Sequence, residues 1–266
     1  MRIRYKQPHG TADISAARGT AFTELWKLIL SAVALLIGLY FLWGAMVDAV
    51  VSRISFESEA KIFQYLEQHQ PETDDPAVVK RIKSAEAILK KLQSAPGVPR
   101  LPYRIVLIDQ QTPNAFAIPG GSIGVTHGLF DVLTEEIEIA FVIGHELGHF
   151  KHRDHLQGLG RAAGYSLMTA VLFDAGAGSK SFGDIIRFVM ERSYSQEREK
   201  KADRFGLTLV HAVYGRVNGT DRLFKLLLED HALPEWAYMF SSHPSPTSRI
   251  LALKSYGDQL MQAKPR

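Results

Sequence analysis

The chain has 266 residues, of which 46% are hydrophobic and 22% are charged, so it has enough apolar side chains to bury a core. It contains no cysteine, which excludes disulfide bonds, thiolate metal ligands, a cysteine nucleophile and a lipid-modified N-terminal cysteine. Its net charge of +3 comes from scattered basic residues without an RNP, KH or zinc-finger pattern, so we expect no nucleic acid partner.

The first predicted element is an apolar helix at residues 28–47, where no charged residue occurs. That length crosses a hydrocarbon core of roughly 30 Å. A buried core helix and a cleaved signal peptide are the alternatives, but the segment is apolar on every face and longer than the roughly 7 to 15 apolar residues of a signal peptide. We therefore predict a transmembrane helix at 28–47.

The orientation of this helix follows from the basic residues at its two ends, because basic excess marks the cytoplasmic side. Those before it are Arg2, Arg4, Lys6, Arg18 and Lys27, whereas only Arg53 and Lys61 follow closely. The sequence therefore predicts a cytoplasmic segment at 1–27, with the bulk of the chain on the other side of the membrane.

Beyond the anchor, one domain is predicted at 52–266, because no internal repeat or low-complexity tract divides it. Helices are predicted at 56–69 and 77–94, the second with Asp75 as N-cap and Pro76 in its first turn. The β-branched run at 103–109 predicts a strand. A second strand is predicted after the turn formed by Pro119, Gly120 and Gly121.

Chemistry concentrates in the stretch His145-Glu146-Leu147-Gly148-His149, which follows a run of apolar residues. Residues four apart share one face of a helix, so His145 and His149 can bind one cation while Glu146 projects beside them. This is the arrangement of zinc peptidases, in which the metal activates a water and the carboxylate takes its proton. A chance match on a surface helix is the alternative, but the apolar residues before the motif favour a buried site.

A catalytic zinc site needs a third protein ligand. The spacing of His155 matches one class of zinc peptidase, but that class carries a glycine three residues after the second histidine, where this chain has His152. Without that turn, a continuing helix would carry His155 about 15 Å along the axis from His145. We therefore expect His152, Asp154 and His155 to lie at the surface.

Glu199 is the better candidate, in a segment whose apolar residues recur at helical spacing. Asp203 stands one turn beyond it and can accept the Nδ1 proton of a ligand histidine, which fixes the tautomer of the ring. Glu191 and Glu197 are competing carboxylates, but Glu197 points about 200° away from Glu199 around a helix. The sequence thus predicts one Zn²⁺ per chain, with three protein ligands: His145, His149 and Glu199.

Four segments occur in a recognisable order: NAFAIPGGSIGVTHGLF, HELGH, the stretch from Glu199 to Asp203, and SSHPSPTSRI. This order resembles the HtpX-type and CAAX-prenyl-protease-type zinc peptidases, family forty-eight of the metallopeptidases, over roughly residues 103–256. The resemblance implies that Glu199 is the third zinc ligand. It also implies that His243 lies near the zinc, as a stabiliser of the oxyanion or as a reversible fourth ligand. One departure is Gln196, where the family often has arginine.

The resemblance, with the predicted elements, implies an α+β, mostly helical fold: a zincin-like domain with a small sheet beside the active-site helix, preceded by one transmembrane helix. The catalytic domain is expected on the periplasmic side of a cell inner membrane, or in the mitochondrial inner membrane if the source is eukaryotic. We expect residues 122–126 to form the exposed edge of the sheet, where an extended peptide can add as another strand.

The expected function is that of a membrane-anchored zinc endopeptidase acting on misfolded or unassembled envelope proteins, with Glu146 as the base. Its expected partners are protein or peptide substrates and, through the anchor, membrane lipid. A catalytically weak chaperone or assembly adaptor that retains the peptidase fold is the alternative, although such a protein has no obvious need for Glu146. A prenyl protease is disfavoured, because the chain lacks the several membrane spans of that type.

Overall fold

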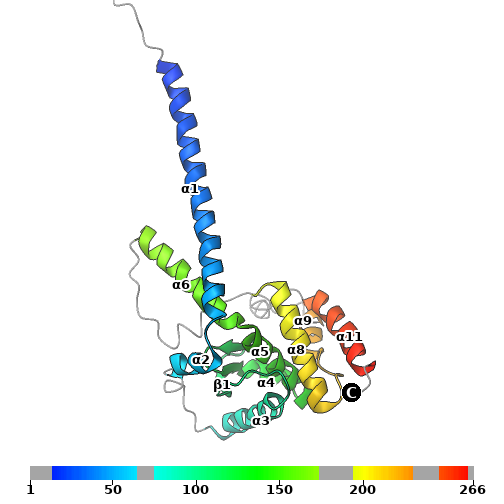
Figure 1. Cartoon of the computed structure of the whole chain (residues 1–266). Helices are drawn as coiled ribbons and strands as arrows, with labels where there is room; N and C mark the ends of the chain where they lie inside the picture. Colours follow the sequence, from blue (N-terminus) through cyan, green and yellow to red (C-terminus); the bar gives the residue numbers. More distant parts are fainter. Residues whose placement is uncertain (1–13, 65–74, 174–193, 230–245, 263–266) are drawn as a thin grey trace, which may run out of the picture. The chain divides into compact units, whose positions relative to one another are not determined.

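The computed structural model describes residues 14–64, 75–173, 194–229 and 246–262 (Figure 1). The chain divides into two compact units, residues 1–47 and 48–266. The predicted His243 and Glu191 lie outside the described residues. Within the described part, the α+β, mostly helical class predicted from the sequence is confirmed.

The first unit contains most of helix α1 (Ile14–Val51), in which the segment Phe22–Val51 is long and apolar enough to cross a membrane. The predicted span at 28–47 lies inside this segment. Its large apolar side chains are exposed, with Leu30 64% and Phe41 68% accessible. Apolar side chains left exposed on every face of a helix are stable in lipid and unstable in water.

Two helices open the second unit. Helix α2 (Phe56–Phe63) begins at the N-cap Ser55, whose hydroxyl accepts a hydrogen bond from the Ser58 amide. Helix α3 (Pro76–Gln93) begins at Asp75, whose carboxylate accepts from the Ala77 amide at 2.8 Å. The predicted helix at 77–94 is thus confirmed together with its N-cap. The predicted helix at 56–69 is present as far as Phe63, and residues 65–74 lie outside the described part.

The sheet has three strands, β1 (Arg104–Ile108), β2 (Ala115–Ile118) and β3 (Ser122–Thr126), in the order β1-β3-β2. Strand β3 pairs in parallel with β1 and antiparallel with β2, and all of its residues are buried. The prediction that 122–126 form an exposed edge is therefore wrong. Gly120 and Gly121, with φ of 91° and 103°, allow a tight hairpin that places β2 along the side of β3 expected to be free.

The remaining described helices follow the sheet along the chain. They are α4 (His127–Val132), α5 (Glu136–His152), α6 (Asp154–Phe173), α8 (Gln196–Tyr214), α9 (Arg222–Glu229) and α11 (Pro246–Gln262). Helix α5 is buried without interruption from Ile139 to Phe150 and packs most extensively against α8. The core therefore forms around α5, between α3 and the sheet on one hand and α8, α9 and α11 on the other.

Candidate active site

Helix α5 presents the histidine motif inside the protein rather than on its surface. A capping box between Glu135 and Glu138 fixes the start of the helix. From there, the helical period brings His145 and His149 to the same face, with their Nε2 atoms 3.1 Å apart. His145, Glu146 and His149 are only 5%, 1% and 0% exposed, so the predicted buried position of the motif is confirmed.

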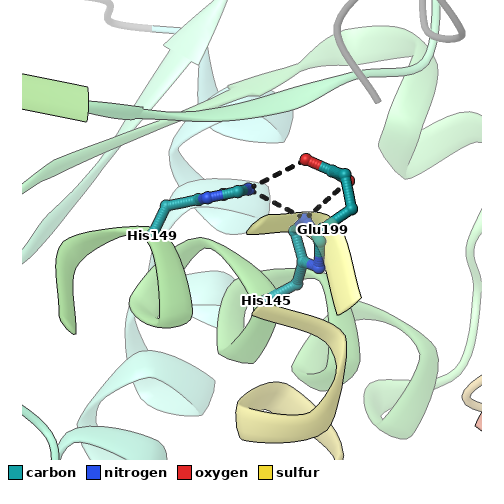
Figure 2. A group of neighbouring side chains, drawn as sticks. All are labelled: His145, His149 and Glu199. Atoms are coloured by element: carbon teal, nitrogen blue, oxygen red, sulfur yellow. Dashed lines mark hydrogen bonds and ion pairs between the residues drawn. The ribbon is translucent and has the colours of Figure 1, made fainter. Parts of the chain in front are cut away.

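Glu199 reaches the same point from α8 (Figure 2). Its Oε2 lies 3.5 Å from Nε2 of His145, and its Oε1 lies 3.4 Å from Nε2 of His149. Glu199 is fully buried, whereas its competitor Glu197 is exposed. The three side chains thus form a group of possible metal-ligand atoms that all lie within 4.8 Å of one another.

The spacing of these atoms suits a tetrahedral cation. Metal–ligand distances of about 2.0–2.2 Å in a tetrahedron put neighbouring ligand atoms about 3.3–3.6 Å apart. The two Nε2 atoms lie 3.1 Å apart, and they lie 3.5 and 3.4 Å from Oε2 and Oε1 of Glu199, respectively. Two imidazole nitrogens and one carboxylate are also the donor set of catalytic zinc sites that keep one open position. The donor set and the proximity of its atoms therefore fit a zinc ion.

Small residues allow α5 and α8 to approach closely enough for this geometry. A Cβ atom on Gly144 would lie 3.1 Å from the Cα of Gly206, and one on Gly148 would lie 2.7 Å from the Cα of Ala202. The backbones of the two helices are therefore in direct contact beside the histidines. Interaxial distance depends on the side chains at the crossing, so these residues set the reach of Glu199.

Each histidine has its own carboxylate partner. Nδ1 of His145 lies 2.9 Å from Oδ1 of Asp203, and Nδ1 of His149 lies 3.0 Å from Oδ2 of Asp154. A proton on each Nδ1 satisfies these contacts and leaves the lone pair of each Nε2 as the donor for a metal. Asp203 thus makes the contact expected of it, and Asp154 makes an equivalent one that the sequence did not reveal.

The expectation that Asp154 and His155 lie at the surface is wrong, since they are only 2% and 3% exposed, while His152 is partly buried. The expectation assumed that the helix of the motif would continue past His152, because no glycine is present there to end it. Instead, Arg153 adopts the left-handed conformation at φ 61° and ends α5, and α6 begins at Asp154 in a new direction. His155 still does not join the metal-ligand group, because its Nε2 lies 2.7 Å from Oε1 of Glu59.

Arg249 on α11 is a further buried residue of the site that sequence reasoning missed. Its guanidinium donates from Nη1 to Oε2 of Glu199 at 2.8 Å. It also donates from Nη2 and Nε to the two oxygens of Asp203, at 2.6 and 2.8 Å. It is 4% exposed. An arginine one turn into an otherwise apolar helix face, beside Ile250 and Leu253, was the available signal.

The charges around the site have clear effects on its ionisable groups. Burial lowers the pKa of His149, but Asp154 and Glu199 outweigh it and raise that pKa to about 10. Burial raises the pKa of Asp203, but the neighbouring Arg249 outweighs it and holds that pKa below its usual value. At His145, burial outweighs Asp203 and Glu199 and lowers the pKa of that ring. The negative charge of Asp203 and Asp154 beside the two rings still favours a cation between them.

A pocket opens beside the histidines, and its lining combines reactive and apolar groups. The reactive or polar residues are Asn114, His145, Glu146 and Arg249, and the others are Ala115, Phe141, Val142, Leu223 and Phe224. On the other side of the motif, the buried ring of Tyr194 stacks on His149, with centroids 4.1 Å apart. The arrangement can therefore place an apolar side chain of a bound molecule next to the carboxylate of Glu146.

Comparison with known proteins gives the family. The chain is 30% identical over 223 residues to a protease HtpX homolog of Campylobacter curvus, covering 68% of this chain and 77% of that protein. It is 24% identical over 198 residues to the mitochondrial metalloendopeptidase OMA1 of Danio rerio, covering 68% of this chain and 41% of that protein. A putative beta-barrel assembly-enhancing protease of Vibrio cholerae is 24% identical over 197 residues, 70% of this chain and 40% of that protein.

The chain therefore spans less than half the length of two of these relatives. The sequence profile described as peptidase family M48 matches residues 80–256, which include both helices of the histidine and glutamate group. The resemblance seen in the sequence is thus confirmed: the chain belongs to peptidase family M48.

Proposed function

We propose that the chain is a zinc endopeptidase, anchored in a membrane by α1, that hydrolyses peptide bonds of misfolded or unassembled envelope proteins. One observation carries the proposal: two imidazole nitrogens and a carboxylate converge at tetrahedral spacing, with Glu146 adjacent on the same helix. Family membership supports peptide or protein substrates. The donor set favours zinc over Mg²⁺ or Ca²⁺, which prefer oxygen ligands.

In this proposal each residue of the site has a distinct task. His145, His149 and Glu199 hold the ion, which supplies Lewis-acid chemistry when bound by lowering the pKa of a water and polarising the peptide carbonyl. Glu146 accepts the proton of the attacking water and delivers it to the leaving amine.

The supporting residues orient this set. Asp203 and Asp154 hold the protons on Nδ1 of the two histidines, so that each Nε2 would be the atom that binds the ion. Arg249 neutralises Asp203 and fixes one oxygen of Glu199. Asn114 and Ala115 line the pocket where it meets the start of β2.

The proposed location follows from the N-terminal helix and the charges around it. The basic residues before the apolar segment favour an N-terminus in the cytoplasm and a catalytic domain in the periplasm of a bacterial cell. A mitochondrial inner membrane is the corresponding site in a eukaryote. The names of two relatives, one mitochondrial and one an enhancer of β-barrel assembly, support a role in the upkeep of envelope proteins.

The proposal is tested with purified protein and unfolded casein, with and without a chelator, beside a Glu146→Gln variant. We expect hydrolysis that the chelator removes and that Glu146→Gln removes, while the zinc content of the variant stays at one per chain. The metal content is maintained because Glu146 acts on water and is not a ligand. Casein binding without hydrolysis by the parent protein would refute the peptidase and favour the adaptor. Loss of zinc in Glu146→Gln would refute the role of Glu146.

His243 completes the proposed machinery, although it lies outside the described residues. As an oxyanion stabiliser it contributes to kcat, so His243→Ala should lower kcat by about a hundredfold with little change in KM. As a reversible fourth ligand it blocks the open position, so the same substitution should raise basal proteolysis. Kinetics equal to those of the parent would exclude both roles.

A further inference from the structure

Glu59 is a fully buried carboxylate on α2, the first helix after the apolar helix, and is the one buried residue of α2. It accepts hydrogen bonds from three places that are distant in the sequence. Oε1 accepts from Nε2 of His155 at 2.7 Å and from the Gly120 amide at 3.1 Å, and Oε2 accepts from Nη1 of Arg153. Burial raises the pKa of Glu59, but these partners outweigh it and keep the carboxylate ionised.

Arg153 is held in an unfavourable backbone conformation by the same segment. It is the one non-glycine residue with a positive φ in the part of the chain that the structure describes. That conformation is strained for a residue with a side chain. Besides its contact with Glu59, its Nη2 donates to the Ile54 carbonyl at 2.7 Å, and its guanidinium stacks on Phe56 at 3.5 Å. Residues 54–59 therefore supply the contacts that offset the strain.

The turn at Arg153 determines where the next residue points. Asp154 is 2% exposed and lies 3.0 Å from Nδ1 of His149, with Nε of Arg198 at 3.3 Å from its other oxygen. The residue after Asp154, His155, contacts both Glu59 and His149. Its Nε2 lies 2.7 Å from Oε1 of Glu59, and its Nδ1 lies 3.3 Å from the His149 carbonyl oxygen. Both neighbours of Asp154 are thus tied to one carboxylate on α2.

We propose that Glu59 is a positioning residue for the metal site: by holding Arg153 and His155 it keeps Asp154 against His149, so that metal retention depends on the helix that follows the apolar segment. This inference rests on the proposed metal site, but not on peptidase activity. Groups that orient a ligand histidine typically contribute about 10–100-fold to metal affinity. Glu59 does not contact a ligand histidine itself. It acts through Arg153 and His155, the two neighbours of Asp154.

The test measures zinc affinity of the full-length protein in detergent by competition with a chromophoric chelator. Glu59→Ala should weaken zinc binding about tenfold or more, and Glu59→Gln should do so less, because an amide oxygen still accepts from His155 or Gly120. The matched control is Glu57→Ala on the same helix, where Glu57 is exposed and pairs with Lys61. The zinc affinity of Glu57→Ala should equal that of the parent protein. If Glu59→Ala does not fold, Glu59→Gln decides.

A double-mutant cycle separates positioning from general damage. In an Asp154→Asn background, Glu59→Ala should have little further effect on zinc affinity, because the path from Glu59 to His149 is already interrupted. Adding Arg153→Gly to Glu59→Ala should recover part of the affinity, since glycine adopts the turn without support. Equal effects of Glu59→Ala in both backgrounds, or parental affinity of a folded Glu59→Ala, would overturn the proposal.

A second readout needs no metal. Amide hydrogen exchange in the metal-free protein should rise at residues 153–157 in Glu59→Ala and stay unchanged in Glu57→Ala. A parent protein that binds zinc but cleaves nothing would refute the proposed activity alone. A parent that binds no zinc would refute the metal site, and exchange then decides the positioning role: unchanged exchange at 153–157 would overturn it as well.

Discussion

Gly206 on α8 lies against the backbone of α5 at the first histidine of the motif. A Cβ atom at this position would lie 2.7 Å from the His145 nitrogen, 3.0 Å from the Gly144 carbonyl carbon and 3.1 Å from the Cα of His145. All three are backbone atoms of a buried helix, so no side chain can rotate away to make room. The added methyl group of Gly206→Ala should therefore push apart the two helices that carry the metal-ligand group.

The size of the effect follows from these distances. Ordinary contact begins at 3.4 Å, so the helices must separate locally by about 3.4 − 2.7 = 0.7 Å. Metal–ligand distances tolerate only about 0.2 Å, and Glu199 lies two turns from Gly206 on the same helix face. We expect zinc affinity to fall by about tenfold or more. Overpacking destabilises by about 1–3 kcal/mol, and the better helix propensity of alanine offsets about 0.5–1 kcal/mol of this. The net destabilisation is therefore about 0–2.5 kcal/mol.

Zinc affinity is measured by chelator competition, and the free energy of unfolding by urea titration of the metal-free protein. Gly257→Ala in α11 is the control, because its Cβ would meet the movable Cγ2 of Val217 at 3.2 Å and lies away from the metal-ligand group. Its zinc affinity should match that of the parent. Parental zinc affinity in Gly206→Ala would refute the idea that the glycine contact sets the reach of Glu199.

Three further results are expected. Hydrogen bonds from Lys91 and Tyr214 hold the pKa of Glu136 low, so its contribution to stability is present above an unfolded pKa of about 4.3 and is lost as the pH falls through the folded value. Glu136→Gln should therefore lower the thermal midpoint at neutral pH but not at about pH 3, and an equal loss at both pH values would contradict this. Arg249→Met leaves Asp203 buried without its cation and should lower the free energy of unfolding by about 3–5 kcal/mol, which urea titration checks. A reporter at the C-terminus should be active only across the membrane from the N-terminus; activity on the same side would overturn the charge argument.

Much of the central site could be predicted from the sequence, because its residues lie on two helices with regular periods. The spacing of His145 and His149 places them on one face, and the same period selects Glu199 over Glu197 and puts Asp203 one turn away. These relations depend only on local geometry. The site also requires that α5 and α8 pack together. Small residues on both helices allow this.

Contacts between distant segments were not predictable in the same way. Glu59 contacts His155, and Arg249 contacts Glu199, although each pair is far apart in the sequence. Nothing in the local sequence of Glu59 or Arg249 specifies these partners. Asp154 was missed because the left-handed turn at Arg153 has no glycine to mark it. The prediction that residues 122–126 form the edge of the sheet was wrong for a similar reason. The short run of β2 lacks the alternation that would have indicated a strand.

The depth of the site has a consequence for the selection of substrates. Glu146 and His149 are 1% and 0% exposed, so a peptide bond reaches them only when the rest of its chain is thin enough to follow it inward. In the proposed function, a folded protein, whose peptide bonds lie on a surface many side chains wide, would fit this buried site less readily than an extended chain. This steric cost of entry would distinguish a loose chain from a compact one without a sequence code.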